Sequence, residues 1–227
     1  GNEQGLCDLG ALPGLFPGYQ DVTGKEIRQK LMHTWDVKRL PDTPGLGRPE
    51  MFERASAGKL RSLYIIGDNP LDVDQEHESQ RKDIEQALRK LSFLVVQDIF
   101  LTETALNADV VLPGACFGEK EGTVTNAERL VQRVRKGLKP PGDAREDQRI
   151  IIDLARRMGY PMDFPSSAAV MEEIARVTPL LAGIRYPRLE KGGLAWPCPT
   201  MQHPGTPRLY TEGFKERRAV FAKVSEE

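Results

Sequence analysis

Three short apolar runs, separated by helical patterns, constrain the fold of this chain more than any other feature. Helical spacing within residues 78–91, and a short helix candidate at 102–107, separate the runs from one another. Strands that are apolar on both faces and alternate with helices are typical of a parallel sheet covered on both sides. The runs lie at residues 60–66, 93–96 and 109–112, and they lead into Gly67-Asp68-Asn69-Pro70, Gln97-Asp98 and Pro113-Gly114-Ala115.

The runs provide only part of a complete sheet, because doubly wound sheets usually contain about five or six strands. After residue 116 the pattern changes to an extended stretch, a basic run and two amphipathic helices at 147–158 and 166–177. We therefore expect an α/β chain, with part of a doubly wound parallel-sheet nucleotide-binding domain followed by a smaller mixed α+β segment. The expected units are residues 1–116, 117–213 and 214–227.

The two ends of the chain differ in character from its centre. Residues 1–60 are rich in glycine and proline, which predicts a surface-wrapping segment with one helix at about 24–33. Residues 218–224 alternate like a strand that has just begun. We therefore expect a piece cut at both ends, with 214–227 as the start of a truncated C-terminal domain.

Charge and composition exclude several classes of function. The 32 basic and 33 acidic residues leave a net charge of −1, so the field that attracts nucleic acid or anionic membranes is absent. No apolar run approaches the roughly 20 residues needed to span a bilayer, and the first residues do not resemble a signal peptide. The cysteines predict neither disulfides nor a metal site, because Cys7, Cys116 and Cys198 lie far apart. We therefore expect a reduced, cytoplasmic protein.

The residues that could carry catalysis do not form a recognisable set. The G-x-S-x-G, P-loop, G-x-G-x-x-G and H-E-x-x-H motifs are all absent. Cys7 has no histidine near it in the sequence, so a small packed thiol is the expected role. His33, His77 and His203 have no ligand-like spacing and are expected at the surface. These patterns indicate a scaffold that holds a ligand without itself supplying a catalytic group.

Binding residues are expected where the strands end, because ligands of parallel sheets lie beyond the carboxyl ends of the strands. Asp68, Asn69, Gln97 and Asp98 could form hydrogen bonds with a nucleotide base or ribose, although the same residue types are also common in ordinary turns. The basic run at 129–139 has two interpretations as well. It forms either a solvated face or an electropositive strand that faces an anionic cofactor or an acidic partner.

Six ordered motifs together resemble the catalytic (alpha) subunit of molybdopterin-dependent formate dehydrogenases, within the wider molybdopterin oxidoreductase family. The later GLAWPCP at 193–199 and HPGTP at 203–207 resemble the formate dehydrogenase branch in particular. The resemblance extends over nearly the whole chain. The six motifs are NEQGLCDLGALP at 2–13, FPGYQ at 16–20, GDNP at 67–70, VQDIFLTETA at 96–105, ADVVLP at 108–113 and EKEGTVTN at 119–126.

The resemblance implies a fold, an activity and a cofactor. Members of the family hold molybdenum or tungsten between two molybdopterin guanine dinucleotides, each cradled by an α/β domain. Formate dehydrogenases oxidise formate to carbon dioxide, in some cases reversibly, and pass the electrons to partner subunits. The implied partners are therefore formate or carbon dioxide, the remainder of the alpha subunit and electron-transfer subunits, with no nucleic acid and no membrane span.

The resemblance also implies which residues bind the cofactor. The set that lines one guanine dinucleotide includes a position, Asn69, where relatives often carry a carboxylate; an amide oxygen there can still accept one hydrogen bond. At Val73 relatives can carry a hydroxyl residue, so a contact from this position would be apolar or made by the backbone. The full cofactor-binding set is Gly67, Asp68, Asn69, Val73, Gln97, Gly114 and Asp147.

The parts of the family that carry the chemistry are expected upstream of Gly1. They include the metal-ligating cysteine or selenocysteine, its adjacent histidine, an arginine and the cysteines of the iron–sulfur cluster. We therefore assign no catalytic residue and no metal ligand to this chain, and we do not expect it to be active alone. The alternative is a non-catalytic paralogue that acts as an assembly or interaction scaffold.

Overall fold

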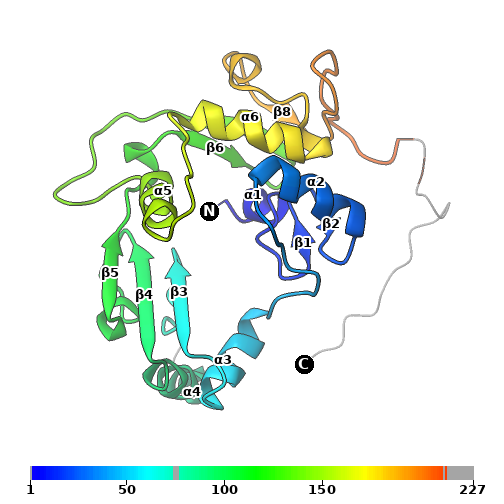
Figure 1. Cartoon of the computed structure of the whole chain (residues 1–227). Coiled ribbons are helices and arrows are strands. Elements are labelled where there is room, and N and C mark those ends of the chain that lie inside the picture. Colours follow the sequence, from blue (N-terminus) through cyan, green and yellow to red (C-terminus); the bar gives the residue numbers. More distant parts are fainter. Residues whose placement is uncertain (1, 74–76, 212, 214–227) are drawn as a thin grey trace.

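The computed structural model describes residues 2–73, 77–211 and 213, and it contains the predicted parallel sheet. Strands β3 (Ser62–Ile66), β4 (Phe93–Asp98) and β5 (Val110–Pro113) lie in that order, and both pairs are parallel. Helix α4 (Glu78–Arg89) follows β3, and the short 3₁₀ helix η2 (Ala105–Asn107) follows β4. The expected α/β class is therefore confirmed, and all three strands end at one edge of the sheet (Figure 1).

One face of this sheet packs on α4. Ile84 and Leu88 of that helix form a buried cluster with Leu94 and Val96 of β4, as their helical spacing predicts. The expectation that both faces are covered was wrong for the described part of the chain. Phe93 keeps 45% of its surface exposed, and Val110 of β5 keeps 37%. Among the described residues, β5 pairs only with β4 and is an edge strand.

The N-terminal segment contains more helix than the sequence predicts. Besides α2 (Lys25–Trp35) and a hairpin of β1 (Leu15–Phe16) and β2 (Gln20–Asp21), it forms α1 (Glu3–Asp8) and α3 (Arg48–Ser56). The prediction of one helix in this segment was therefore wrong. In α3, proline occupies the first turn, where it is tolerated, and the side chain of Glu50 accepts the Gly47 N–H at 3.0 Å. Turn-type residues thus begin this helix instead of preventing it.

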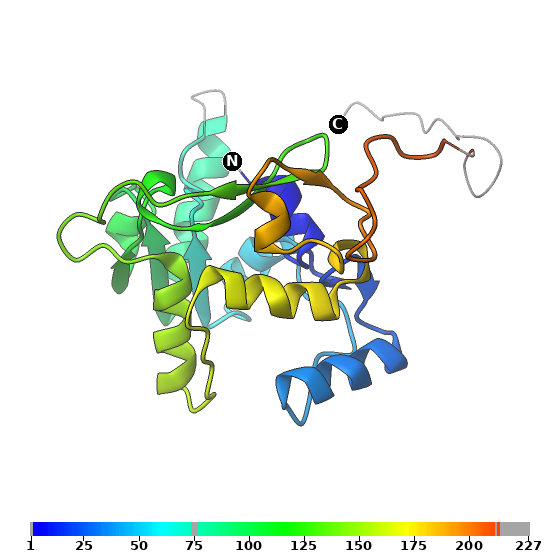
Figure 2. The same ribbon diagram turned by 90° about the horizontal axis from the view of Figure 1, so that it is seen from above.

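The remaining elements form a second unit around an antiparallel sheet. Strands β6 (Gly122–Thr125), β7 (Leu130–Val134) and β8 (Leu194–Ala195) lie in that order. Helix α6 (Ser167–Val177) runs along this sheet, and α5 (Asp147–Arg157) lies beside the carboxyl ends of the parallel strands (Figures 1 and 2). The short 3₁₀ helices η3 (Phe117–Glu119), η4 (Pro179–Leu181) and η5 (Tyr186–Leu189) complete the set.

Both long helices of the second unit begin and end close to their predicted limits. Ser166 caps α6, because its hydroxyl accepts the Ala169 N–H at 3.2 Å. The predicted strand at 218–224 lies outside the described residues. No helix in the described part of the chain is both long and apolar enough to cross a membrane.

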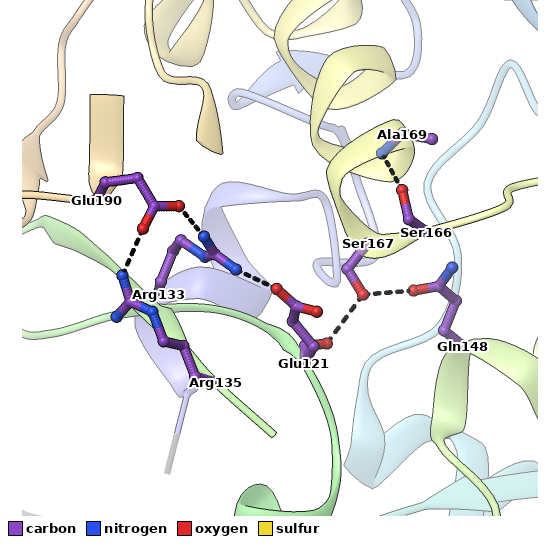
Figure 3. A network of polar contacts seen from close by, with 8 residues as sticks. All are labelled: Glu121, Arg133, Arg135, Gln148, Ser166, Ser167, Ala169 and Glu190. Carbon is purple, nitrogen blue, oxygen red and sulfur yellow. Dashed lines mark hydrogen bonds and ion pairs between the residues drawn. The ribbon is translucent and has the colours of Figure 1, made fainter. Parts of the chain in front are cut away.

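The basic run at 129–139 is neutralised largely by carboxylates of this chain. Arg133 on β7 pairs with Glu121 and Glu190, and Arg135 pairs with Glu190 at 2.9 Å (Figure 3). Lys136 pairs with Glu146 at 2.6 Å. These pairs account for much of the run without an external anion.

Arg133 is the most enclosed of these cations, with 13% of its side chain exposed. Its guanidinium lies 4.5 Å from the centre of the Tyr186 ring, but its Nε is buried without a hydrogen-bond partner. Burial lowers the pKa of Arg133, and the hydrogen bonds and charges of Glu121 and Glu190 outweigh burial and raise it overall. Beside it, Ser167 Oγ lies 3.0 Å from the Glu121 carbonyl oxygen and 2.9 Å from Gln148 Oε1, which links α6 to α5 (Figure 3).

We expect Arg133→Met to destabilise the β6-β7-β8 unit by roughly 2 kcal/mol, because it removes two ion pairs and the contact with Tyr186. The measurement is hydrogen exchange of the β7 amides in the complete protein. Arg135→Met is the control, since Arg135 is 55% exposed and, among the described residues, makes a single ion pair, with Glu190. Equal effects of the two substitutions would show that the enclosure of Arg133 contributes nothing.

A buried carboxylate joins the start of the chain to a distant loop. Asp8 of α1 is 3% exposed and accepts three hydrogen bonds from neutral donors. Gln4 Nε2 and the Tyr19 hydroxyl each donate at 2.8 Å, and Trp196 Nε1 donates at 2.7 Å across 188 positions of sequence. Arg129 lies 5.3 Å from the centre of the Trp196 ring. This cluster, Gln4, Asp8, Tyr19 and Trp196, is called the Asp8 cluster below.

The Asp8 cluster predicts a loss of stability in alkaline solution. Burial, followed by the hydrogen bond and charge of Asp8, raises the pKa of Tyr19 to about 12. Between pH 10 and 12 the folded protein then binds a proton that the unfolded chain has lost, so stability falls as the pH rises. Thermal midpoints measured across this range should fall less steeply for Tyr19→Phe than for the unsubstituted protein. Parallel curves would exclude this role for Tyr19.

Candidate functional site

The three loops that follow the parallel strands meet at one edge of the sheet. Gly67, directly after β3, donates its N–H to the Gln97 carbonyl oxygen at 2.9 Å, which continues the β3-β4 ladder by one residue. Its φ angle of +62° lies in the left-handed region that favours glycine. A Cβ at this position would meet no atom within 4 Å. The backbone at the end of β3 therefore borders open space that a ligand could approach closely.

Asn69 is held by the loop that follows β4. Its Oδ1 accepts the Thr104 N–H at 3.2 Å and the Thr104 hydroxyl at 2.6 Å. Its Nδ2 donates to Glu103 Oε2 at 2.8 Å. The Asn69 side chain, which the sequence predicts as a hydrogen-bond acceptor, thus already accepts two hydrogen bonds from Thr104. Its amide nitrogen donates a third hydrogen bond to Glu103.

Gln97 connects two strands to α5 from a buried position. It is 1% exposed, its Oε1 accepts the Tyr64 hydroxyl, and its Nε2 donates to Asp147 Oδ1 at 2.6 Å. Lys120 forms an ion pair with the second oxygen of Asp147. Burial, together with the charge of Asp147, raises the pKa of Tyr64, which keeps its hydroxyl protonated as a donor. The Asp147 side chain is 31% exposed, so it is the member of this chain of contacts that faces solvent.

The absence of a side chain at Gly114 leaves room for the Asp147 carboxylate. A Cβ at Gly114 would lie 3.1 Å from Asp147 Oδ1, closer than nearly all such contacts. The Gly114 N–H donates to the Asp98 carbonyl oxygen at 2.9 Å, and Gly114 forms a parallel bridge with Arg145 shortly before α5. Gly114 therefore fixes the approach of α5 to the strand ends.

The remaining candidate residues have other neighbours. Asp68 pairs with Arg48 of α3 at 3.3 Å. Asp98 Oδ1 accepts the N–H groups of Ile99 and Phe100 at 2.6 and 3.2 Å, so it stabilises its own turn. Val73 is partly buried, and among the described residues it makes no side-chain hydrogen bond with the other candidates.

The predicted residues thus fall into two clusters at one sheet edge. Gln97, Gly114 and Asp147 form one, and Asn69 belongs to the other, with Gly67 bonded to the backbone of Gln97. Two further polar residues lie at this edge, Glu103 and Lys120, and the sequence pattern did not indicate them. Both lie in motifs that carried the family resemblance, which was the available signal. The spacing of residues 102–107 predicts only a short helix.

The chemistry of this edge is that of a binding wall. It offers carboxylate oxygens, an ammonium group and open backbone. No group of three or more histidine, cysteine or acidic residues that could hold a metal is found among the described residues. Cys7, Cys116 and Cys198 are all free thiols. The wall can bind and orient a polar ligand, and it presents no recognisable nucleophile or metal centre.

Comparisons with known proteins identify the family of the chain. The sequence profile described as "Molybdopterin oxidoreductase" matches residues 5–157. The chain is 46% identical over 217 residues to F420-dependent formate dehydrogenase 2 subunit alpha of Methanococcus maripaludis, a match that covers 94% of this chain and 31% of that protein. It is 40% identical over 216 residues to formate dehydrogenase H of Escherichia coli, covering 94% of this chain and 30% of that protein.

The chain thus spans about a third of the length of these curated relatives. Among solved structures, acetylene hydratase from Pelobacter acetylenicus has a similar fold, with a TM-score of 0.52 and 20% identity over 74% of this chain and 23% of that one. The profile match covers more than half of the present sequence. This chain belongs to the molybdopterin oxidoreductase family.

Proposed function

We propose that this chain is the part of a formate dehydrogenase catalytic subunit that holds one molybdopterin guanine dinucleotide. The observation that carries the proposal is the polar edge at which β3, β4 and β5 end. The relatives named as formate dehydrogenases match 94% of this chain. Gly67, Asp68, Asn69, Val73, Gln97, Gly114 and Asp147 form the proposed wall of the cofactor site.

The donors and acceptors at this edge suit a guanine dinucleotide. Glu103 and Asp147 offer carboxylate oxygens to N–H groups of a base or to ribose hydroxyls. Lys120 pairs with Asp147, and Arg48 pairs with Asp68. Both cations are of the kind that binds phosphate. The open backbone at Gly67 admits a ligand without a clash. The residues present therefore fit the organic part of the cofactor.

The chain's own contribution to the reaction is positioning. Bound molybdopterin with molybdenum or tungsten would supply the two-electron exchange with formate. Asp147, held by Gln97 and by Lys120, would orient the nucleotide end of the cofactor. No catalytic or metal-binding residue is assigned within the chain, so the groups that move protons or bind the metal would come from elsewhere in the subunit.

The finer architecture is part of the same proposal. We place a partial dinucleotide-binding domain at residues 1–116, a mixed segment of the adjoining domain at 117–213, and the start of a C-terminal domain at 214–227. The complete subunit would carry two dinucleotides and an iron–sulfur cluster and pass electrons to partner subunits. The three free thiols support a location in the reducing cytoplasm.

The experiment that tests this function uses the complete protein in which the chain occurs. Metal and pterin analysis of the purified protein should find molybdenum or tungsten together with a guanine dinucleotide, and formate should reduce an artificial electron acceptor. A protein that folds but contains neither metal nor pterin would refute the proposal and favour the scaffold alternative.

A further inference from the structure

The carboxylates at the carboxyl edge of the parallel sheet differ in what already neutralises them. Asp68 pairs with Arg48, and Asp147 pairs with Lys120. Asp98 accepts two N–H groups of its own turn. Each of these three is thus occupied by a cation or by backbone donors.

Glu103 is the exception among these carboxylates. It is exposed, and within the described part of the chain its one side-chain hydrogen bond is the 2.8 Å bond from Asn69 Nδ2 to Oε2, with no ion pair. That hydrogen bond is the largest influence on the Glu103 carboxyl and lowers its pKa, which keeps the side chain ionised at neutral pH. The Glu103 backbone and the charge of Arg81 lower that pKa further, and within the described part of the chain no other residue donates a hydrogen bond to Oε1.

Asn69 cannot take the same role, because its oxygen is already saturated. An amide oxygen has two lone pairs, and both are used by the Thr104 N–H at 3.2 Å and the Thr104 hydroxyl at 2.6 Å. The amide is therefore fixed from one side by Thr104. From the other side it directs the Glu103 carboxylate.

The edge of guanine that carries N1–H and the exocyclic N2 amino group consists of neighbouring donors. A carboxylate is the side chain that matches two neighbouring donors, because it offers only acceptors. Ribose hydroxyls, in contrast, both donate and accept, so an amide serves them nearly as well.

We propose that Glu103 is the carboxylate that accepts the N1–H and N2–H groups of the guanine base, with Asn69 as the residue that positions it. This inference rests on the function proposed above. It places the carboxylate that recognises the guanine base in the loop after β4, at Glu103, and not in the loop after β3, at Asn69. Asp147 and Lys120 would then contact other parts of the nucleotide, its ribose or its phosphates.

The first test substitutes Glu103→Gln in the complete protein and measures the GMP released by acid hydrolysis per polypeptide. We expect the GMP content to fall to half or less, because an amide nitrogen would face a donor of the base at one of the two dinucleotide sites proposed for the complete subunit. Glu85→Gln is the matched control, since Glu85 is also a glutamate held by one side chain, Arg89, at 2.7 Å on α4. The control should keep the GMP content of the unsubstituted protein.

A second variant separates base recognition from local folding. Asn69→Asp with Glu103→Gln reverses the direction of the hydrogen bond between the two side chains and preserves their total charge. We expect a thermal midpoint close to that of the unsubstituted protein, with the GMP content still at half or less of the unsubstituted value. Recovery of full GMP content would show that the position of the carboxylate is irrelevant and would overturn the inference.

The remaining outcomes separate this inference from the proposed function. If the unsubstituted protein releases GMP and Glu103→Gln releases the same amount, the inference fails while the function stands; ribose recognition by Glu103 would give this result. If the unsubstituted protein releases no guanine nucleotide, both fail together.

Discussion

Replacing Asp8 with alanine is expected to destabilise the N-terminal segment by about 4 kcal/mol, because it leaves three donors without their shared acceptor. Trp196 Nε1 and the Tyr19 hydroxyl are partly buried, and each orphaned donor of this kind costs about 1–3 kcal/mol. Hydrogen exchange of the α1 and β1-β2 amides in the complete protein should accelerate by roughly a thousandfold, since each tenfold corresponds to about 1.4 kcal/mol.

Two further variants test the origin of this effect. Asp8→Asn keeps the shape of the side chain but replaces one acceptor oxygen with an amide NH₂ group, which faces the donors of the cluster. We therefore expect a smaller loss of stability that is still above about 1 kcal/mol. Asp42→Ala removes an exposed carboxylate from the same segment and should change the exchange rates little. An Asp8→Ala protein with exchange rates like those of Asp42→Ala would show that the cluster contributes no stability.

The parallel sheet could be predicted because local sequence determines it. The runs at 60–66, 93–96 and 109–112 are short and apolar and end in turn residues, and the structure places a strand within each. Parallel strands must end at one edge, so the location of the candidate site followed from topology alone. The motif resemblance then predicted the family, which the profile match confirms.

The Asp8 cluster could not be predicted, because it depends on contacts between distant positions. Nothing near Asp8 in the sequence indicates Trp196 as its partner, 188 positions away. Helix α3 was missed for a different reason. The glycine and proline content of residues 1–60 predicts turns, whereas Gly47 and Pro49 stand at the start of a helix, where both are tolerated.

The candidate site could be predicted as a set of loops but not as a set of contacts. Sequence alone cannot show that the Asn69 amide is already bonded to Thr104, or that Gln97 is buried beneath Asp147. Both facts change what these residues can do. Asn69 and Gln97 hold carboxylates in place, so in the proposed function the groups that would meet the ligand are their neighbours.

Gln97→Ala in the complete protein is expected to reduce the bound pterin to half or less and to lower the bound metal with it. Gln97 ties the ends of β3 and β4 to α5 through Tyr64 and Asp147, and alanine removes both links from a site that is 1% exposed. Asp147 would then keep Lys120 as a partner but lose the support that fixes its direction. The measurement is molybdenum or tungsten and released GMP per polypeptide.

The controls separate the positioning of Asp147 from general damage to the fold. Gln97→Met keeps the volume of the side chain without its hydrogen bonds, and Asp147→Asn removes the charge that Gln97 positions; both should lower cofactor content as Gln97→Ala does. Gln80→Ala changes an exposed glutamine on α4 and should leave the content unchanged. If Gln97→Ala retains full metal and GMP while Asp147→Asn loses them, Asp147 binds the cofactor without help from Gln97. Full retention by both variants would place the cofactor away from this edge of the sheet.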